Sequence, residues 1–179
     1  MTAWKSTPTQ ASRVIPGRRP AVPIKRHNGW FVLHLPEFEA RFVALAEDVE
    51  GLRARLAVPA YRQHPTVKLF ASVMRLVREV VPADPNAPRF RLTGDLRTFR
   101  RAKNLGMPPR YRLFWVFSER HRTIVFLYLN DESTPQKEGA STDPYEVFSR
   151  LVARGEIGVD FASNLRAWRT TYPDVELPS

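Results

Sequence analysis

The sequence predicts one α+β domain, in which a small, twisted, antiparallel-dominated sheet packs against two N-terminal helices and a further helix follows near the C-terminus. Two observations carry this prediction: helical apolar stripes occupy the first half of the chain, and short apolar runs typical of strands occupy the middle. At 179 residues and 43% hydrophobic, the chain can form one core with tails. The folded domain is expected over residues 28–155.

The two ends of the chain are expected to lie outside this domain. Residues 1–27 contain four prolines, six lysines or arginines and no acidic residue, which predicts a basic arm that is disordered or extended. This arm either binds a partner or is a solvated leader. Residues 156–179 are expected to form a tail, and a weak helical pattern over 164–170 makes it a candidate for a short docked helix.

The first half of the domain is predicted to hold one strand and two helices. The run 30–35 is too short for a helix and is rich in aromatic and β-branched residues, as strands are. A helix begins at Pro36, with glutamates in its first turn and an apolar stripe that ends before Pro59. A second helix is expected from about Thr66 and is closed by Pro82.

Strands are predicted to dominate the middle of the chain. The proline-dense segment 82–88 is expected to be a loop. Strands are then expected over 98–103, 111–118 and 123–129. The last two are apolar on both faces, which indicates a central hairpin covered by helices on at least one side.

A C-terminal helix is predicted from its start and stop signals. Asp143, Pro144 and Glu146 have the pattern of an N-cap, a first helical residue and a capping-box glutamate. Gly155 is expected to end this helix.

The clearest functional signal is a run of cations between Asp95 and Glu119, where no carboxylate occurs. Its members are Arg97, Arg100, Arg101, Lys103, Arg110 and Arg112. A rigid sheet with guanidinium groups on its rim suits a polyanion, because planar arginine grips phosphate with two parallel hydrogen bonds. The chain has 28 Lys plus Arg, 18 Asp plus Glu and a formal net charge of +10, so its first expected partner is RNA or DNA.

Composition also argues against several classes of site. The absence of cysteine excludes disulfides, thiolate zinc sites and cysteine nucleophiles. No run approaches the roughly 20 apolar residues of a membrane span, so a cytoplasmic protein without membrane contact is expected. The four histidines lack the paired spacing of metal motifs, and the adjacent Asp131 and Glu132 are interpreted as surface or capping groups. We therefore expect neither a metal nor another cofactor.

Three strings occur in order along the chain. They are Asn28-Gly29-Trp30, Arg110-Tyr111-Arg112-Leu113-Phe114, and Asn130-Asp131-Glu132 followed by Thr142-Asp143 and Tyr145-x-Val147-Phe148. Together they resemble the YhaV toxins of the RelE/ParE superfamily, over about residues 28–155. The resemblance implies a RelE-like fold and a toxin of a type II toxin–antitoxin pair, an endoribonuclease that cuts mRNA, in many relatives on the ribosome. It also implies cleavage without a metal, in which the RNA's own 2'-OH attacks the adjacent phosphorus.

The resemblance implies roles for four residues. Arg112 falls on the arginine that contacts the scissile phosphate in relatives and is the first choice for transition-state stabilisation. Arg101 and Lys103 fall on the basic pair of the preceding strand, and their spacing puts both on one face. Lys103 is the better candidate for proton transfer, because arginine keeps its proton. Tyr145 lies where relatives carry a tyrosine that stacks on a base or assists proton transfer.

Four further cations are candidates for binding RNA or phosphate. Arg110 matches the family string, and Arg97 and Arg100 belong to the same basic run, although Arg100 is also interpreted as a solvated cation on the opposite strand face. Lys137 is the fourth candidate. It lies in a stretch that departs from the family pattern of arginine, tyrosine and two lysines, because this chain has Gln136, Glu138, Ala140 and Ser141 there. These departures leave open whether cleavage is weakened or lost.

The resemblance also implies partners and leaves two alternatives. The partners are mRNA, the ribosome as a candidate, and a PrlF-type antitoxin, whose complex with the toxin would bind operator DNA. One alternative is a non-catalytic RNA- or ribosome-binding module or co-repressor on the same fold. The other is a ParE-like inhibitor of gyrase, which the retained basic pair and Arg112 disfavour.

Overall fold

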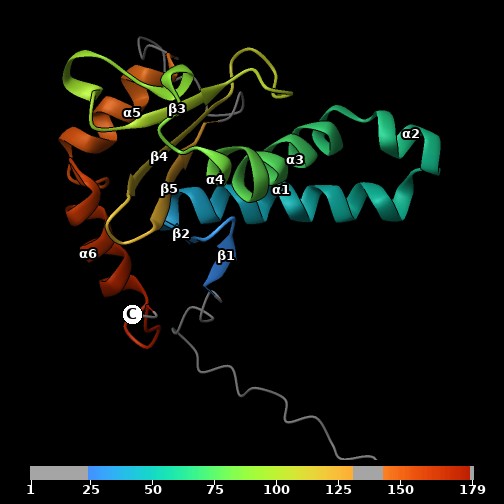
Figure 1. Cartoon of the computed structure of the whole chain (residues 1–179). Helices are drawn as coiled ribbons and strands as arrows, with labels where there is room; N and C mark the ends of the chain where they lie inside the picture. Colours follow the sequence, from blue (N-terminus) through green and yellow to red (C-terminus); the bar gives the residue numbers. More distant parts are fainter. Residues whose placement is uncertain (1–23, 131–142, 178–179) are drawn as a thin grey trace, which may run out of the picture.

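In the computed structural model, which describes residues 24–130 and 143–177, a five-stranded sheet lies between two groups of helices (Figure 1). The strands are β1 (Lys25–His27), β2 (Trp30–His34), β3 (Arg100–Lys103), β4 (Arg112–Ser118) and β5 (Thr123–Leu129). Their order is β1-β2-β5-β4-β3. The central pair β2 and β5 is parallel and the other three pairings are antiparallel. The predicted α+β class is confirmed.

The described helices are α1 (Pro36–Arg55), α2 (Val58–Gln63), α3 (Pro65–Arg75), α4 (Val81–Ala83), α5 (Pro144–Ala153) and α6 (Phe161–Thr171). They form two layers, one on each face of the sheet, except that α2 joins the far ends of α1 and α3 away from the strands (Figure 1). Short 3₁₀ turns, Pro88–Phe90 and Gly94–Leu96, lead into β3. No helix in the described part of the chain is long and apolar enough to span a bilayer.

Two cores explain why the central strands are apolar on both faces. On β4, Leu113 and Trp115 belong to the core under α1 and α3, whereas Phe114 and Val116 belong to the core under α5 and α6. Alternate side chains of a strand point to opposite faces, so a strand between two helical layers must be apolar throughout. The N-terminal helices therefore cover only one face, and the C-terminal helices cover the other.

The sheet begins before the predicted domain boundary. Residues 25–27, which the sequence assigned to the arm, form β1 and pair with β2. Asn28 and Gly29 both have positive φ (48° and 78°), as the tight hairpin turn between the strands requires. The Asn28 Nδ2 also donates to the Pro82 carbonyl oxygen over 3.0 Å. The rest of the arm, residues 1–23, lies outside the described residues.

The predicted second helix is interrupted. It begins at Pro65, but between α3 and α4 the segment Leu76–Val80 is a π-helical turn, in which the Val81 N–H donates to the Leu76 carbonyl oxygen. Pro82 lies inside α4 rather than closing the helix. Proline lacks an N–H and its ring clashes with the carbonyl four residues earlier, and a wider turn relieves this clash.

The C-terminal tail is an integral layer of the fold. α6 is longer than the expected 164–170 because a capping box between Asp160 and Ser163 fixes its start. Trp168 is only 1% exposed, and the Tyr172 hydroxyl donates to the Glu39 carboxylate at the start of α1. The tail thus docks on the core under α5 and α6 and reaches the N-terminal helix.

Candidate functional site

Three of the predicted residues meet where the edge strand β3 pairs with β4. Lys103 is the direct partner of Arg112 across the two strands, and Arg101 is the partner of Phe114. Residues two apart on a strand share a face, and partners across a ladder share it too. Arg101, Lys103 and Arg112 therefore project from the face that α5 and α6 cover.

Tyr145 is the fourth member of this group, which we call the Arg112 cluster (Arg101, Lys103, Arg112 and Tyr145). The guanidinium carbons of Arg101 and Arg112 lie 5.6 and 5.8 Å from the centroid of the Tyr145 ring, within the range of cation–π attraction. The Phe114 ring packs edge-on against Tyr145 at 5.9 Å. The tyrosine therefore joins α5 to both strands.

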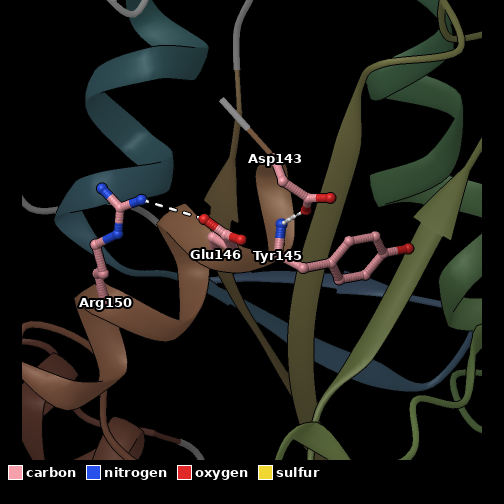
Figure 2. Close-up of polar contacts among 4 residues, drawn as sticks. All are labelled: Asp143, Tyr145, Glu146 and Arg150. Atoms are coloured by element: carbon pink, nitrogen blue, oxygen red, sulfur yellow. Dashed lines mark hydrogen bonds and ion pairs between the residues drawn. The ribbon is translucent and has the colours of Figure 1, made fainter. Parts of the chain in front are cut away.

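The start of α5 fixes the position of Tyr145 (Figure 2). Asp143 is the N-cap and its Oδ1 accepts the Tyr145 backbone N–H over 2.7 Å, as the sequence predicted for the cap. Pro144 occupies the first helical position. Glu146 has a different partner from the expected capping box, because its carboxylate lies 3.4 Å from Arg150 one turn later.

Within the described chain, no ion pair joins the cations of this cluster, Arg101, Lys103 and Arg112, to a carboxylate. Arg112 donates through Nη1 to the carbonyl oxygens of Tyr111, at 2.8 Å, and Pro109. The Nε atoms of Arg101 and Arg112 are buried and have no hydrogen-bond partner among the described residues. Because an unsatisfied buried donor is costly, two of them beside one ring indicate a place for an anion.

Arg100 and Arg97 are not part of this cluster. Arg100 points to the opposite face, where its Nε and NH2 donate to Asn86 Oδ1 at 3.0 and 2.9 Å and its NH1 donates to the carbonyl oxygens of Arg97 and Phe99. Burial, and then the charge of Arg91, lower the pKa of Arg100. Arg100 therefore holds the loop that contains Asn86 in place. Arg97 is exposed on the turn before β3.

Arg110 lies beside the Arg112 cluster. Arg110 is exposed just before β4, two residues from Arg112. Lys137 and the departures at 136, 138, 140 and 141 lie outside the described residues.

Asn130 belongs to one of the three strings, but sequence reasoning gave it no role in the site; it follows β5 directly and is 7% exposed. Its Oδ1 accepts the Arg112 backbone N–H, and its Nδ2 donates to the Arg110 carbonyl oxygen over 2.9 Å. Its own N–H donates to the Arg112 carbonyl oxygen over 3.3 Å. One amide thus fixes the backbone from which Arg112 projects. The strand register, with Leu129 opposite Leu113, places residue 130 beside residue 112, and an irregularity at Phe114 and Trp115 shifts that register.

No histidine lies in the Arg112 cluster. His34, at the end of β2, packs against the rings of Phe38 and Phe126, and burial lowers its pKa to about 4. It is neutral at pH 7. His121 lies in the turn between β4 and β5, where it contacts Ser118. Over residues 24–130 and 143–177, no three His, Asp or Glu side chains form a group that could hold a metal ion.

Comparison with known proteins gives one consistent result. Residues 32–168 match the Toxin_YhaV family, described as a toxin with endonuclease activity of a toxin–antitoxin system. The chain is 33% identical over 144 residues to "Toxin YhaV" of Escherichia coli O6:H1, covering 78% of this chain and 92% of that protein. It is 32% identical over 153 residues to "Ribonuclease toxin YhaV" of Escherichia coli K12, covering 83% and 97%. No solved structure matches the chain.

Proposed function

Because this chain belongs to the YhaV family of toxins with endonuclease activity, we propose that it cuts messenger RNA at the Arg112 cluster, as the toxin of a type II toxin–antitoxin pair. The choice of site rests on the buried Nε atoms of Arg101 and Arg112, which have no hydrogen-bond partner among the described residues and belong to guanidinium groups close to the Tyr145 ring. RNA and an antitoxin are the partners that this activity requires.

The cluster suits cleavage by the RNA's own 2'-OH. In that reaction the 2'-oxygen forms a bond to the adjacent phosphorus as the bond from phosphorus to the 5'-oxygen breaks, which leaves a 2',3'-cyclic phosphate and a 5'-OH. Negative charge builds up on the phosphoryl oxygens, where Arg112 and Arg101 would donate hydrogen bonds. One proton leaves the 2'-OH and another reaches the 5'-oxygen, and Lys103 and Tyr145 are the groups here that can exchange protons.

The finer identity of the partners is part of the same proposal. We assign the antitoxin to the PrlF type and propose that one of its segments covers the Arg112 cluster. Operator DNA would be bound by the toxin–antitoxin complex rather than by the toxin alone. The cytoplasm, where mRNA and ribosomes are found, is the proposed location. Whether the ribosome presents the RNA is decided by comparing cleavage with and without ribosomes.

The test of this function is the chemistry of the product ends. We expect a defined mRNA to be cut to 2',3'-cyclic phosphate and 5'-OH ends. Cleavage in a reaction without ribosomes should not change on addition of EDTA. A single 2'-deoxy substitution at the nucleotide that precedes the cut should abolish that cut and leave others intact. Ends with 3'-OH and 5'-phosphate would disprove attack by the 2'-OH. Uncut RNA that still binds the chain would favour the non-catalytic alternative.

Asn130→Ala is expected to lower kcat for RNA cleavage about tenfold or more with a smaller change in KM. The reason is that Arg112 would keep its charge but lose the fixed backbone from which it acts, and small misplacements of catalytic groups are costly. Single-turnover cleavage at saturating toxin measures this directly. Asn130→Asp should lower kcat as much as Asn130→Ala does, because a carboxylate cannot donate to the Arg110 carbonyl oxygen. Full activity in both variants would remove Asn130 from the site.

A further inference from the structure

A second group of cations surrounds Trp30 at the other edge of the sheet. We call it the Trp30 cluster (Lys25 on β1, Arg78 in the π-helical turn, and Arg122 just before β5). The Arg122 guanidinium carbon lies 4.2 Å from the centroid of the Trp30 ring. Trp30 belongs to the core under α1, whereas Arg101 pairs with Phe114 of the core under α5 and α6, so the two clusters lie on opposite faces of the sheet. β1, which carries Lys25, is the edge strand opposite β3 (Figure 1).

Strand pairing and a helix contact bring these cations together. On β1, Lys25 is opposite Val32 and His27 is opposite Trp30, so both share the face of the α1 core with Trp30. Burial lowers the pKa of His27, and the nearby charges of Arg78 and Lys25 lower it further. The bond from Asn28 to the Pro82 carbonyl oxygen ties the β1–β2 turn to the helical segment that carries Arg78.

The three cations of the Trp30 cluster, Lys25, Arg78 and Arg122, are exposed to solvent. None of them forms an ion pair with a carboxylate in the described chain. The row continues across the sheet, because the Trp30 ring meets the Phe117 ring at 6.0 Å and the Arg100 guanidinium lies 5.4 Å over Phe117. The Arg100 guanidinium is already bonded to Asn86 and to backbone carbonyl oxygens, so it adds positive charge to this face rather than free donors. Arg122, which is exposed and lies close to the Trp30 ring, can donate to phosphate.

We propose that the Trp30 cluster is a second RNA-binding surface, which holds the phosphodiester backbone of the transcript away from the point of cleavage. This proposal rests on RNA being the substrate, as argued above. An acidic protein is the less suitable partner, because a stable protein interface needs apolar anchors at its centre. Trp30 is only 5% exposed, and the exposed large apolar side chains of the described chain are elsewhere, namely Val43, Val58 and Val159.

The test measures binding separately from cleavage. The probe is a long single-stranded RNA with 2'-O-methyl groups throughout, which cannot be cut by 2'-OH attack, and binding to the full chain is followed by fluorescence anisotropy over a salt series. In the triple variant Lys25→Gln, Arg78→Gln, Arg122→Gln, we expect about tenfold weaker binding at low salt. The slope of log affinity against log salt should become shallower by about 2, since each phosphate contact contributes about 0.7.

Matched variants separate a local effect from one of total charge. Arg62→Gln, Arg166→Gln and Arg169→Gln together remove the same charge from exposed positions on α2 and α6, and they should leave the slope near that of the wild type. Arg78→Lys with Arg122→Lys keeps the charge and should keep the slope, which guards against loss of binding through misfolding.

Three outcomes would overturn the proposal. The first is an unchanged slope in the triple glutamine variant, and the second is an equal loss of slope in the control triple variant. The third is that the triple glutamine variant loses as much affinity for polyglutamate of matched charge as it loses for RNA. That result would assign the surface to an acidic protein. If the variants show the expected slopes but the wild type never cuts unmodified RNA, the proposed function is refuted. The proposal that the Trp30 cluster binds RNA is then still supported.

Discussion

Arg112→Ala is expected to lower the rate of RNA cleavage about 100- to 1,000-fold, the usual effect of removing one preorganised donor to a developing anion. Within the Arg112 cluster, Arg112 is the cation with the most hydrogen bonds to the described chain. Its backbone N–H and carbonyl both bond to Asn130, its Nη1 donates to two carbonyl oxygens, and its buried Nε has no acceptor among the described residues. Its side chain is therefore organised before RNA arrives.

The measurement is single-turnover cleavage of one RNA by the wild type and by Arg112→Ala. The cleavage rate of Arg112→Lys should lie between those of the wild type and Arg112→Ala, because lysine keeps the charge but cannot make two parallel hydrogen bonds to phosphate. Arg166→Ala removes an exposed arginine from α6 and is the control for charge. If Arg112→Ala and Arg166→Ala cleave equally well, the Arg112 cluster is not the catalytic site.

Phe148→Ala is expected to lower the free energy of unfolding by about 3–5 kcal/mol, as large truncations of buried aromatic rings do. The Phe148 ring is fully buried and stacks on Phe114 at 4.1 Å between centroids. It also meets Phe99 edge-on at 5.0 Å. These contacts attach α5 to the sheet, and α5 carries Tyr145. We therefore expect cleavage to fall even at temperatures where the variant remains folded.

Urea denaturation of the full chain gives the change in free energy, and cleavage is measured well below the midpoint. Phe161→Ala is the matched control, since Phe161 is only partly buried at the start of α6 and its loss should cost clearly less. Phe148→Leu, which keeps much of the volume, should recover most of the stability. Equal costs for Phe148→Ala and Phe161→Ala would contradict the role given to the Phe148 ring.

Local patterns were sufficient to predict where several residues of the Arg112 cluster lie in the fold. The i, i+2 spacing of Arg101 and Lys103 placed both on one strand face, and the N-cap pattern at Asp143 placed Tyr145 at a helix start. Both depend on residues that are close in sequence. The position of Asn130 beside Arg112 depends on the register between β4 and β5, which no single strand pattern contains. The same holds for Arg100, whose partner Asn86 comes from a loop.

The two helical layers of the fold were also only partly predictable from the sequence. Apolarity on both faces of 111–118 and 123–129 indicated burial, but it did not reveal that a C-terminal layer covers the second face. Trp168 and Tyr172 pack there at positions with only weak helical periodicity. The parallel pairing of β2 with β5 was also beyond prediction, because it joins segments separated by most of the domain.

This parallel pair has a consequence for how the chain acquires its structure during synthesis. β2 leaves the ribosome early, yet its central partner β5 follows only after all of α1 to β4 has been made. Contacts between such distant segments form slowly, because a long loop must close before any of them is gained. A nascent or truncated chain that stops before Thr123 therefore lacks the strand that joins its two halves. The two halves of the domain can therefore be joined only after β5 has left the ribosome.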